Sequence, residues 1–303
     1  MLSQRAADGI EDLAIAARLM SAAWSAGAPY VAGTPAAIEW WYALTDPEPL
    51  GDHLRLWFDD GEAVAWSWHE SPEVEWHVWS GDETRDQEIF ATIVDAALDE
   101  ARGGELGVFA ADHHEAAITV LRERGFSPAG RVLTQWHHRV ADPLASAPLP
   151  GGYRIRGLRG PEEFDARVAL HRAAFPTSRL NVAKYERLMT VPHYRLEDDL
   201  VVEAPDGSLA AFALTWWDPE GQVGELEPVG THPSHQRRGL SRAVIAAAVA
   251  SLRDRGVTVV QVYSDASEGP AEALYPAAGF ARRATHRRYA IGSSDATGAT
   301  IGA

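Results

Sequence analysis

The sequence predicts an α/β (α+β) protein with two tandem domains, each a mixed central sheet flanked by helices. The same order of predicted elements occurs in both halves: helices, three strands, a helix, a strand, a helix and a strand. A short repeat supports this duplication, since Val120–Phe126 matches Leu274–Phe280 at an offset of 154 positions. Between the halves, Asp142–Gly152 contains three prolines and two glycines, which is typical of a linker. We therefore expect a first domain over 1–141, a linker over 142–152, a second domain over 153–291 and a disordered tail over 292–303.

The composition is that of a globular protein with a sizeable core. The chain has 303 residues, more than one typical domain, and 46% of them are hydrophobic. No apolar run approaches the ~18 residues needed to span a bilayer, and the N-terminal segment lacks the layout of a signal peptide. We expect a cytoplasmic protein with no membrane partner.

Charge and cysteine content exclude several classes of function. The formal net charge is −16, which argues against a nucleic-acid partner because phosphate binding needs a basic surface. The acidic balance either serves solubility or accelerates the approach of a cationic small molecule. The chain has no cysteine, which excludes disulfides, thiolate metal sites and a covalent cysteine intermediate. The histidines are scattered and form no HExxH pattern, so we predict no metal site.

In the first half, each predicted element has a local signal. Apolar residues at helical spacing predict a helix over Glu11–Ala26, and Thr34-Pro35 is typical of an N-cap that opens a second helix. Alternating residues predict three strands around Leu54–Phe58, 63–68 and 74–79. The half ends with helix Thr84–Arg102, strand Leu106–Ala110, helix His113–Arg124 and strand Arg131–Val140.

Tryptophan is concentrated in this half. Eight of the 11 tryptophans precede position 80. They either pack the core and the domain interface or form an aromatic pocket that binds a cation over a ring face. Trp66 and Trp68 share one side of a strand and Trp57 lies on a neighbouring strand, so a wall of indoles is one interpretation.

The second half is predicted in the same way. We expect strand Tyr153–Arg156, helices Pro161–Ala174 and Asn181–Met189, and a hairpin of Leu200–Ala204 with Leu209–Trp217 around Pro205-Asp206-Gly207. After the stretch described next, we expect helix Arg242–Arg253, the nearly continuous β-branched strand Val257–Tyr263, a helix that Pro270 opens, and strand Arg282–Tyr289.

The stretch Gly224–Ser241, GELEPVGTHPSHQRRGLS, carries the chemistry. It begins as a strand, in which Pro228 predicts a bulge, and ends in a turn that opens an alanine-rich helix. The first N–H groups of a helix have no partners inside it and favour an anion. Gly239 and Ser241 are small enough for phosphates to approach the backbone. Three arginines, Arg237, Arg238 and Arg242, add positive charge.

Two motifs in this half resemble those of a known family. Gln236-x-x-Gly239-x-Ser241 after a strand resembles motif A of the GNAT superfamily of acyl-CoA-dependent N-acetyltransferases, and Ala271-x-x-Leu274-Tyr275-x-x-x-Gly279-Phe280 resembles its motif B. The tandem arrangement is most similar to the mycothiol-synthase-like branch. The equivalent segment of the first half, Ser80–Arg85, has three acidic residues and no Gln-x-x-Gly loop. We therefore expect a degenerate GNAT-like first domain that does not bind CoA in the usual way.

The resemblance implies acetyl-CoA as co-substrate and a binding site for it. In the family, the strand before motif A splays from its neighbour and the pantetheine arm inserts there, while the pyrophosphate lies on the helix N-terminus. The position that is often Asn before motif B is Glu268 here, which puts one cofactor contact in doubt. The predicted cofactor-binding residues are Val229, Gly230, Thr231, Gln236, Arg237, Arg238, Gly239, Leu240, Ser241, Arg242, Glu268 and Leu274.

The resemblance also implies catalytic residues. Transfer to an amine needs a base for the ammonium proton, and Glu225 is the first candidate and Glu227 the second. The alternative for either carboxylate is a salt bridge to an arginine. Tyr275 occupies the position of the family's general acid, and its alternative is a buried structural tyrosine. The Val229 amide is the candidate donor to the acetyl oxygen.

The acceptor remains open at this stage. We expect a small-molecule amine, either cationic or not, with Phe175, Arg179, Tyr185 and His193 as acceptor-site candidates. The alternatives are a tandem GNAT protein that binds acyl-CoA or a ligand without turnover, and an N-acetyltransferase of proteins or peptides. The expected assembly is a monomer, as a pseudo-dimer of domains, or a homodimer.

Overall fold

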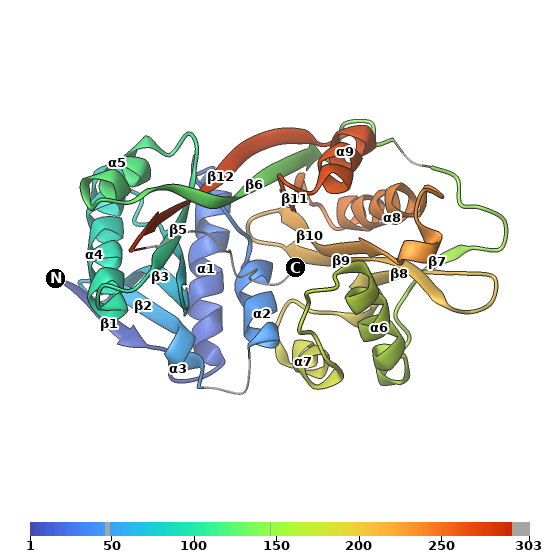
Figure 1. Cartoon of the computed structure of the whole chain (residues 1–303), viewed down its shortest axis with the longest axis horizontal. Helices are drawn as coiled ribbons and strands as arrows, with labels where there is room; N and C mark the ends of the chain where they lie inside the picture. Colours follow the sequence, from blue (N-terminus) through green and yellow to red (C-terminus); the bar gives the residue numbers. More distant parts are fainter. Residues whose placement is uncertain (46–48, 146, 293–303) are drawn as a thin grey trace.

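The structure is a computed structural model that describes residues 1–45, 49–145 and 147–292 (Figure 1). The predicted tail therefore lies almost entirely outside the described residues. The described elements of the first half are β1 (Leu2–Ala6), α1 (Glu11–Ser25), α2 (Pro35–Leu44), α3 (Leu50–His53), β2 (Leu54–Asp59), β3 (Glu62–Glu70), β4 (Glu73–Val78), α4 (Glu83–Ala101), β5 (Leu106–Ala111), α5 (Glu115–Glu123) and β6 (Ser127–Arg139).

The second half repeats this order. Its elements are β7 (Arg154–Gly157), α6 (Phe164–Ala174), α7 (Val182–Arg187), β8 (Asp199–Glu203), β9 (Leu209–Asp218), β10 (Val223–Thr231), α8 (Leu240–Asp254), β11 (Val259–Asp265), α9 (Gly269–Ala278) and β12 (Ala281–Ile291). Short 3-10 turns cover Pro161–Glu163, Leu188–Thr190, Leu196–Asp198 and Pro233–His235. The sequence analysis did not predict β1 and α3; both are short, and β1 is mostly exposed.

All twelve strands form one mixed sheet, in the order β1-β2-β3-β4-β5-β12-β6-β11-β10-β9-β8-β7. Each half has an antiparallel run that ends in one parallel pair, β4 with β5 in the first half and β10 with β11 in the second. The mixed sheet with flanking helices confirms the predicted fold class.

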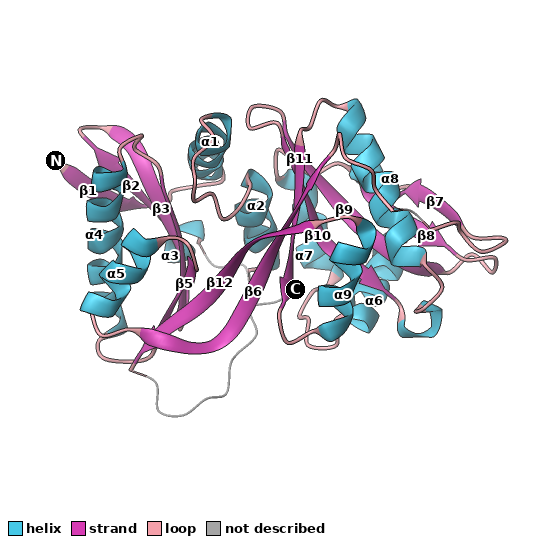
Figure 2. Ribbon diagram, turned by 90° about the horizontal axis from the view of Figure 1, so that it is seen from above, coloured by secondary structure: helices cyan, strands magenta, loops and turns pink. Residues whose placement is uncertain are grey.

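The final strand of each half lies in the sheet of the other half. β12 pairs with β5, so that Ile291 faces Leu106, and β6 pairs with β11, so that Arg139 faces Val259. β6 and β12 also pair with each other, and Figures 1 and 2 show these two long strands crossing from one half to the other. The linker therefore divides the sequence, whereas the sheet is continuous across both halves.

Helices cover both faces of the second-half strands. Alternate residues of a strand point to opposite faces, so Ala211 and Ala213 pack beneath α8, while Phe212 and Leu214 pack against α6 and α7. Helix α2 of the first half joins this second layer through Ala36, Trp40 and Ala43, and buries them among second-half residues. The two halves thus share a hydrophobic core as well as a sheet.

Two local predictions about the chain are confirmed. Thr34 is the N-cap of α2, and its Oγ1 accepts a hydrogen bond from the Ala36 amide at 3.3 Å. The ladder between β9 and β10 shifts register between Leu226 and Val229, where Pro228 predicted a bulge.

Candidate active site

β10 and β11 separate at the predicted motif. They pair only over Val223–Glu225, and among the described residues no strand pairs with the rest of β10 on its β11 side. The His232 amide donates to the Ala210 carbonyl of β9 at 2.9 Å. Because hydrogen-bonded and non-bonded pairs alternate in an antiparallel ladder, the N–H groups of Val229 and Thr231 point away from β9, into the opening.

The N-terminus of α8 borders this opening and is uncapped. Gly239 is its N-cap, with φ +79° and no side-chain cap. The first helical bond runs from the Ala243 amide to the Gly239 carbonyl at 3.0 Å, and none of the six amides from Arg237 to Arg242 donates to a described residue. A Cβ on Gly239 would lie 3.0 Å from Cβ of Ala147 and would force a left-handed conformation. This terminus can accept an anionic group.

The arginines around the terminus differ in position. Arg237 and Arg242 line the cavity described below, whereas Arg238 donates to the Tyr153 hydroxyl at 2.8 Å and lies outside the lining. The side chain of Arg238 is therefore held away from the predicted phosphate position, and only its amide borders it. Ser241 Oγ lies 2.8 Å from Oγ1 of Thr231, so the hydroxyl that replaces a smaller family residue ties the helix to β10.

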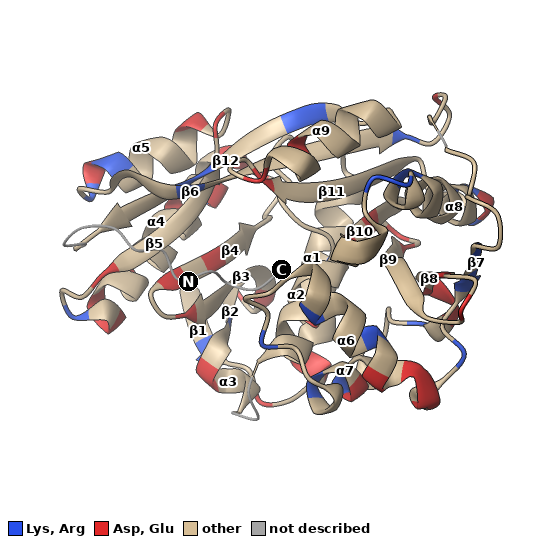
Figure 3. Ribbon diagram, turned by 45° about the vertical axis from the view of Figure 1, so that its right-hand side comes forward, with Lys and Arg blue, Asp and Glu red and all other residues tan. Residues whose placement is uncertain are grey.

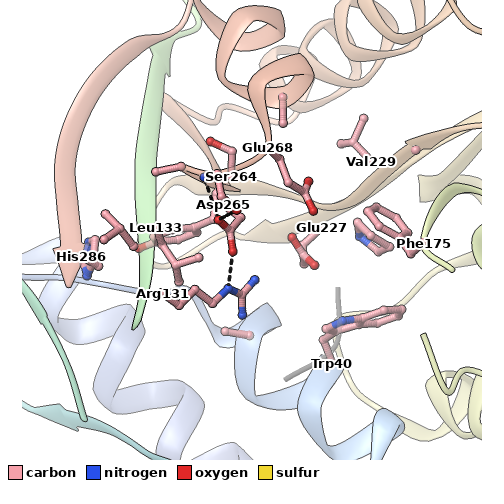
Figure 4. Close-up of a pocket in the computed structure, with 18 of the residues that line it drawn as sticks. Trp40, Arg131, Leu133, Phe175, Glu227, Val229, Ser264, Asp265, Glu268 and His286 are labelled. Carbon is pink, nitrogen blue, oxygen red and sulfur yellow. Dashed lines mark hydrogen bonds and ion pairs between the residues drawn. The ribbon is translucent and has the colours of Figure 1, made fainter. Parts of the chain in front are cut away.

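A single cavity of about 2120 Å³ joins these features to the first half. It is lined by the remaining predicted cofactor residues, by the three predicted catalytic residues, and by side chains of α2, β3, β4 and β6. In Figure 4, the Glu227 carboxylate points into the pocket, with Glu268 above it, Trp40 below and Phe175 beside it.

The two glutamates of β10 have different surroundings. Glu225 is 3% exposed, and its Oε2 accepts hydrogen bonds from Oγ1 of Thr34 and from Nε2 of Gln261, the latter at 3.0 Å. Burial raises the pKa of Glu225, although both hydrogen bonds oppose the shift. The Glu227 carboxylate accepts no hydrogen bond from a described residue; burial and the charge of Glu225 raise its pKa to about 8, against the charge of Arg131. Glu225 is thus fixed in place, whereas Glu227 is open to a ligand.

Tyr275 lines the same cavity in a mostly apolar setting. The residue is 5% exposed, and its ring packs against Trp136 and Phe280 at centroid distances of 6.3 and 5.8 Å. Burial, with the charges of Glu227 and Glu268, raises the pKa of Tyr275 far above its ordinary value. The phenol therefore keeps its proton and can donate it into the cavity.

The first half supplies an aromatic wall, although with different members from those predicted. Trp41 contacts both Trp66 and Trp68 at centroid distances of 6.1 Å, and all three line the cavity. Trp57 does not join them, because it pairs with Ala65 and packs with Ile89 and Ile93 on the other face of the sheet. The prediction that included Trp57 in the wall was wrong for this reason.

Of the four acceptor-site candidates, one lines the cavity. Phe175 does so, whereas Arg179 lies on the surface, 3.4 Å from Glu70. Tyr185 is fully buried and donates to Asp199, and Nδ1 of His193 lies 2.6 Å from Oε1 of Glu39. These three side chains belong to structural contacts, and their polar partners could not be predicted from local sequence.

The corresponding opening of the first half is narrower. β4 and β5 pair only at Glu73 and Val74, but beyond this point Nε1 of Trp76 donates to the Phe109 carbonyl of β5 at 2.9 Å. At the N-terminus of α4, the Asp82 side chain accepts from the Arg85 amide at 2.9 Å. A cavity of about 140 Å³ lies between β4, β5 and the start of α4, far smaller than the cavity of the second half.

Within the part of the chain that the structure describes, no helix is long and apolar enough to cross a membrane. Nor do three or more His, Cys, Asp or Glu side chains of the described residues gather in a way that could hold a metal ion.

Comparisons with known proteins agree with this geometry. Residues 168–280 match the model of the Acetyltransferase (GNAT) family. The mycothiol acetyltransferase of Salinispora tropica is 31% identical over 197 residues, which cover 62% of this chain and 64% of that protein, so the match spans less than two thirds of the relative. The mycothiol acetyltransferase of Acidothermus cellulolyticus is 29% identical over 258 residues, covering 76% of this chain and 77% of the relative.

Two solved structures share the fold along nearly the whole chain. A GCN5-related N-acetyltransferase from Sphaerobacter thermophilus has a TM-score of 0.65 at 18% identity and covers 95% of each chain. A tandem GNAT protein from the clavulanic acid biosynthesis pathway has a TM-score of 0.64 at 14% identity, covering 98% of this chain and 100% of that one. The chain therefore has the fold of the tandem GNAT proteins, and its residues 168–280 match the model of the GNAT acetyltransferase family.

Proposed function

We propose that the protein is an acetyl-CoA-dependent N-acetyltransferase that acts on a small-molecule amine by direct transfer. One observation carries the proposal: a single cavity contains an uncapped helix N-terminus, an open strand edge and a carboxylate beside a phenol. The relatives named mycothiol acetyltransferase support acetyl transfer to a small molecule.

The co-substrate would supply a thioester-activated acetyl group, and the chain has a matching place for each of its parts. The open amides of residues 237–242, with Arg237 and Arg242, would bind the phosphates. The β11-facing edge of β10 would pair with the amides of the pantetheine arm, as an added strand does. The Val229 amide, which faces the opening, would donate to the acetyl oxygen.

We assign the base to Glu227 and a positioning role to Glu225, which reverses the order predicted from sequence. A carboxylate whose pKa is about 8 can take a proton from an ammonium group near neutral pH more readily than an ordinary glutamate can. Both hydrogen bonds to Glu225 go to the same oxygen, Oε2, and hold the side chain against α2 and β11. Its negative charge in turn keeps the pKa of Glu227 high.

Tyr275 is the proposed acid. Its protonated phenol borders the same cavity as Glu227, and it would donate a proton to the departing CoA sulfur. Proton removal and proton return would thus use two different side chains.

The polarity of the cavity favours a cationic acceptor. Basic residues lie in the loop that leads into α8, and acidic residues lie on β4 and β10 (Figure 3). Walls from both halves surround the acidic end, which suits a compact molecule better than a protein chain end. A non-catalytic binding protein is the second candidate, and turnover distinguishes it.

Calorimetric titration with acetyl-CoA, followed by an assay of thiol release over a panel of amines, tests the proposal. We expect one binding site per chain and amine-dependent thiol release, with no background from the cysteine-free protein. Binding without release for any amine would favour the binding protein, and absence of binding would refute the cofactor site.

Two matched variants then identify the base. We expect Glu227→Gln to lower kcat by about 100-fold or more, and Glu225→Gln to lower it less. A base acts when deprotonated, so kcat/KM of the wild type should rise with pH through about 8, and Glu227→Gln should remove this rise. A larger loss in Glu225→Gln, with the pH dependence retained in Glu227→Gln, would return the role to Glu225.

A further inference from the structure

The first half contributes its own pair of glutamates to the active-site cavity. In β10, Glu225 is the last residue paired with β11, and Glu227 follows it where the strands separate. In β4, Glu73 pairs with Gly107 of β5, and Glu75 lies just beyond the last pair, Val74 with Val108. All four glutamates line the same cavity, so the fold presents two carboxylate pairs from opposite halves to one ligand.

Glu75 resembles Glu227 in its surroundings. Its carboxylate accepts no hydrogen bond from a described residue. Burial and the charge of Glu73 raise the pKa of Glu75 to about 7, while the charge of Arg131 opposes the shift. The charge of Arg131 thus lowers the pKa of both Glu75 and Glu227, and Arg131 itself forms an ion pair with Asp265 at 2.7 Å. Glu75 is ionised in mildly basic solution and can then bind a cation.

Glu73 adds a second carboxylate on the same strand face. The residue is 6% exposed, and Arg288 donates only to its Oε1, at 2.7 Å. The other oxygen, Oε2, is buried against Gly107 of β5 and has no hydrogen-bond partner among the described residues. Glu73 therefore contributes negative charge to this end of the cavity rather than a contact with the ligand.

An indole lies next to these carboxylates. Trp68 is the cross-strand neighbour of Glu75, both side chains line the cavity, and Trp68 is 2% exposed. Side chains of directly opposite strand residues lie side by side on one face. A carboxylate beside an aromatic ring is a favourable setting for an ammonium group.

From these observations we infer that Glu75, beside Trp68 and with the charge of Glu73 behind it, binds a second positively charged nitrogen of the acceptor. The preferred acceptors are then diamines, with the reacting amino group at Glu227 and the other at Glu75. This inference rests on the proposed acetyltransferase function. It also gives the first half a role in acceptor selection.

The test compares short α,ω-diamines with monoamines of the same chain length. The quantity measured is kcat/KM for thiol release from acetyl-CoA, in mildly basic buffer. We expect the wild type to prefer the diamine of best length by about 10- to 100-fold, as for a charged hydrogen bond. Glu75→Gln should remove most of this preference through KM, and Glu75→Asp should restore part of it. The control Glu70→Gln, at the cavity edge beside Arg179, should keep it.

Equal kcat/KM for the two amines in the wild type, or an unchanged ratio in Glu75→Gln, would overturn the inference. If no amine supports thiol release, the proposed function fails. The diamine subsite can then still be tested separately, by measuring the binding of diamines and monoamines with calorimetry. Tighter diamine binding that Glu75→Gln abolishes would support the subsite, and equal binding would refute it. Melting temperatures of all variants establish that they are folded.

Discussion

The N-termini of α4 and α8 occupy equivalent places in the two halves but have opposite chemistry. At α4, Asp82 accepts from the Arg85 amide at 2.9 Å, and Asp86 accepts from the Ser80 amide at 2.8 Å. At α8, Gly239 provides no side-chain cap, and the six amides of residues 237–242 have no described acceptor. An acidic residue that satisfies its own helix also repels a phosphate. Of these two helix N-termini, the uncapped one is therefore better suited to bind an anion.

The openings between the neighbouring strands also differ between the two halves. In the second half, β10 keeps a free edge toward β11, whereas in the first half the Trp76 indole bridges β4 and β5. One half has therefore kept the groove that the proposed cofactor needs. The other half keeps only a small cavity beside Trp76 and offers its glutamates and tryptophans to the shared cavity.

The strongest test of this contrast is Gly239→Glu. The new side chain would clash with Ala147, force a non-glycine residue to φ +79° and place a negative charge at the open amides. We expect acetyl-CoA affinity to fall by more than about 100-fold, measured by calorimetry. The control is Arg85→Ala, at the position that the repeat aligns with Gly239, and it should leave one acetyl-CoA site per chain. Retained binding in Gly239→Glu would remove α8 from the site.

Tyr275→Phe tests the proposed acid of the second half. The first half has Leu121 at the position that the repeat aligns with Tyr275. Loss of the phenol proton should lower kcat by about 100-fold while the acetyl-CoA dissociation constant stays nearly unchanged. Tyr289→Phe is the matched control, since Tyr289 is buried in the first-half core and does not line the cavity. Equal kcat values in the two variants would exclude Tyr275 as the acid.

The smallest effect concerns the capped helix. Asp82→Ala should lower the free energy of unfolding by about 0.5–2 kcal/mol, the usual contribution of an N-cap, measured by urea denaturation. The control is Asp99→Ala, near the C-terminal end of the same helix. It removes a negative charge from the end of the helix dipole where such a charge is unfavourable, so the free energy of unfolding should not fall. We also expect Asp82→Ala to create no second acetyl-CoA site, because Trp76 still bridges β4 and β5 and the cavity beside it is small. A second site in calorimetry would show that the cap alone excludes the cofactor.

Much of the fold could be predicted because its signals are local. Thr34 caps α2, Pro228 marks the bulge in β10, and the boundaries of α8 and α9 follow from the glycines and prolines around them. The exchange of β6 and β12 could not be predicted, since nothing in either strand specifies a partner that is distant in sequence. The side of the sheet on which Trp57 lies could not be predicted either, because it depends on the pairing of Trp57 with Ala65 of the next strand.

The predicted catalytic and cofactor-binding residues other than Arg238 lie around one cavity, and the roles we propose for the two glutamates differ from those predicted. The motif residues around Gly239 and Tyr275 line one cavity, as expected from their resemblance to the family. The distinction between Glu225 and Glu227 depends on Thr34, which reaches Glu225 from the other half. Similarly, Glu73 and Glu75 carry no motif, and only the three-dimensional fold brings them to the active site.

The exchanged strands also affect how this chain folds during its synthesis. Residues 281–291 are the last described segment to leave the ribosome, and they supply the strand that covers the edge of β5. Until then, the first half exposes an unpaired apolar strand, LGVFAA, which is a template for aggregation. Such distant pairing raises contact order and slows folding. Neither half, expressed alone up to the linker or from it, would have its own native sheet, so we expect neither to fold without the other.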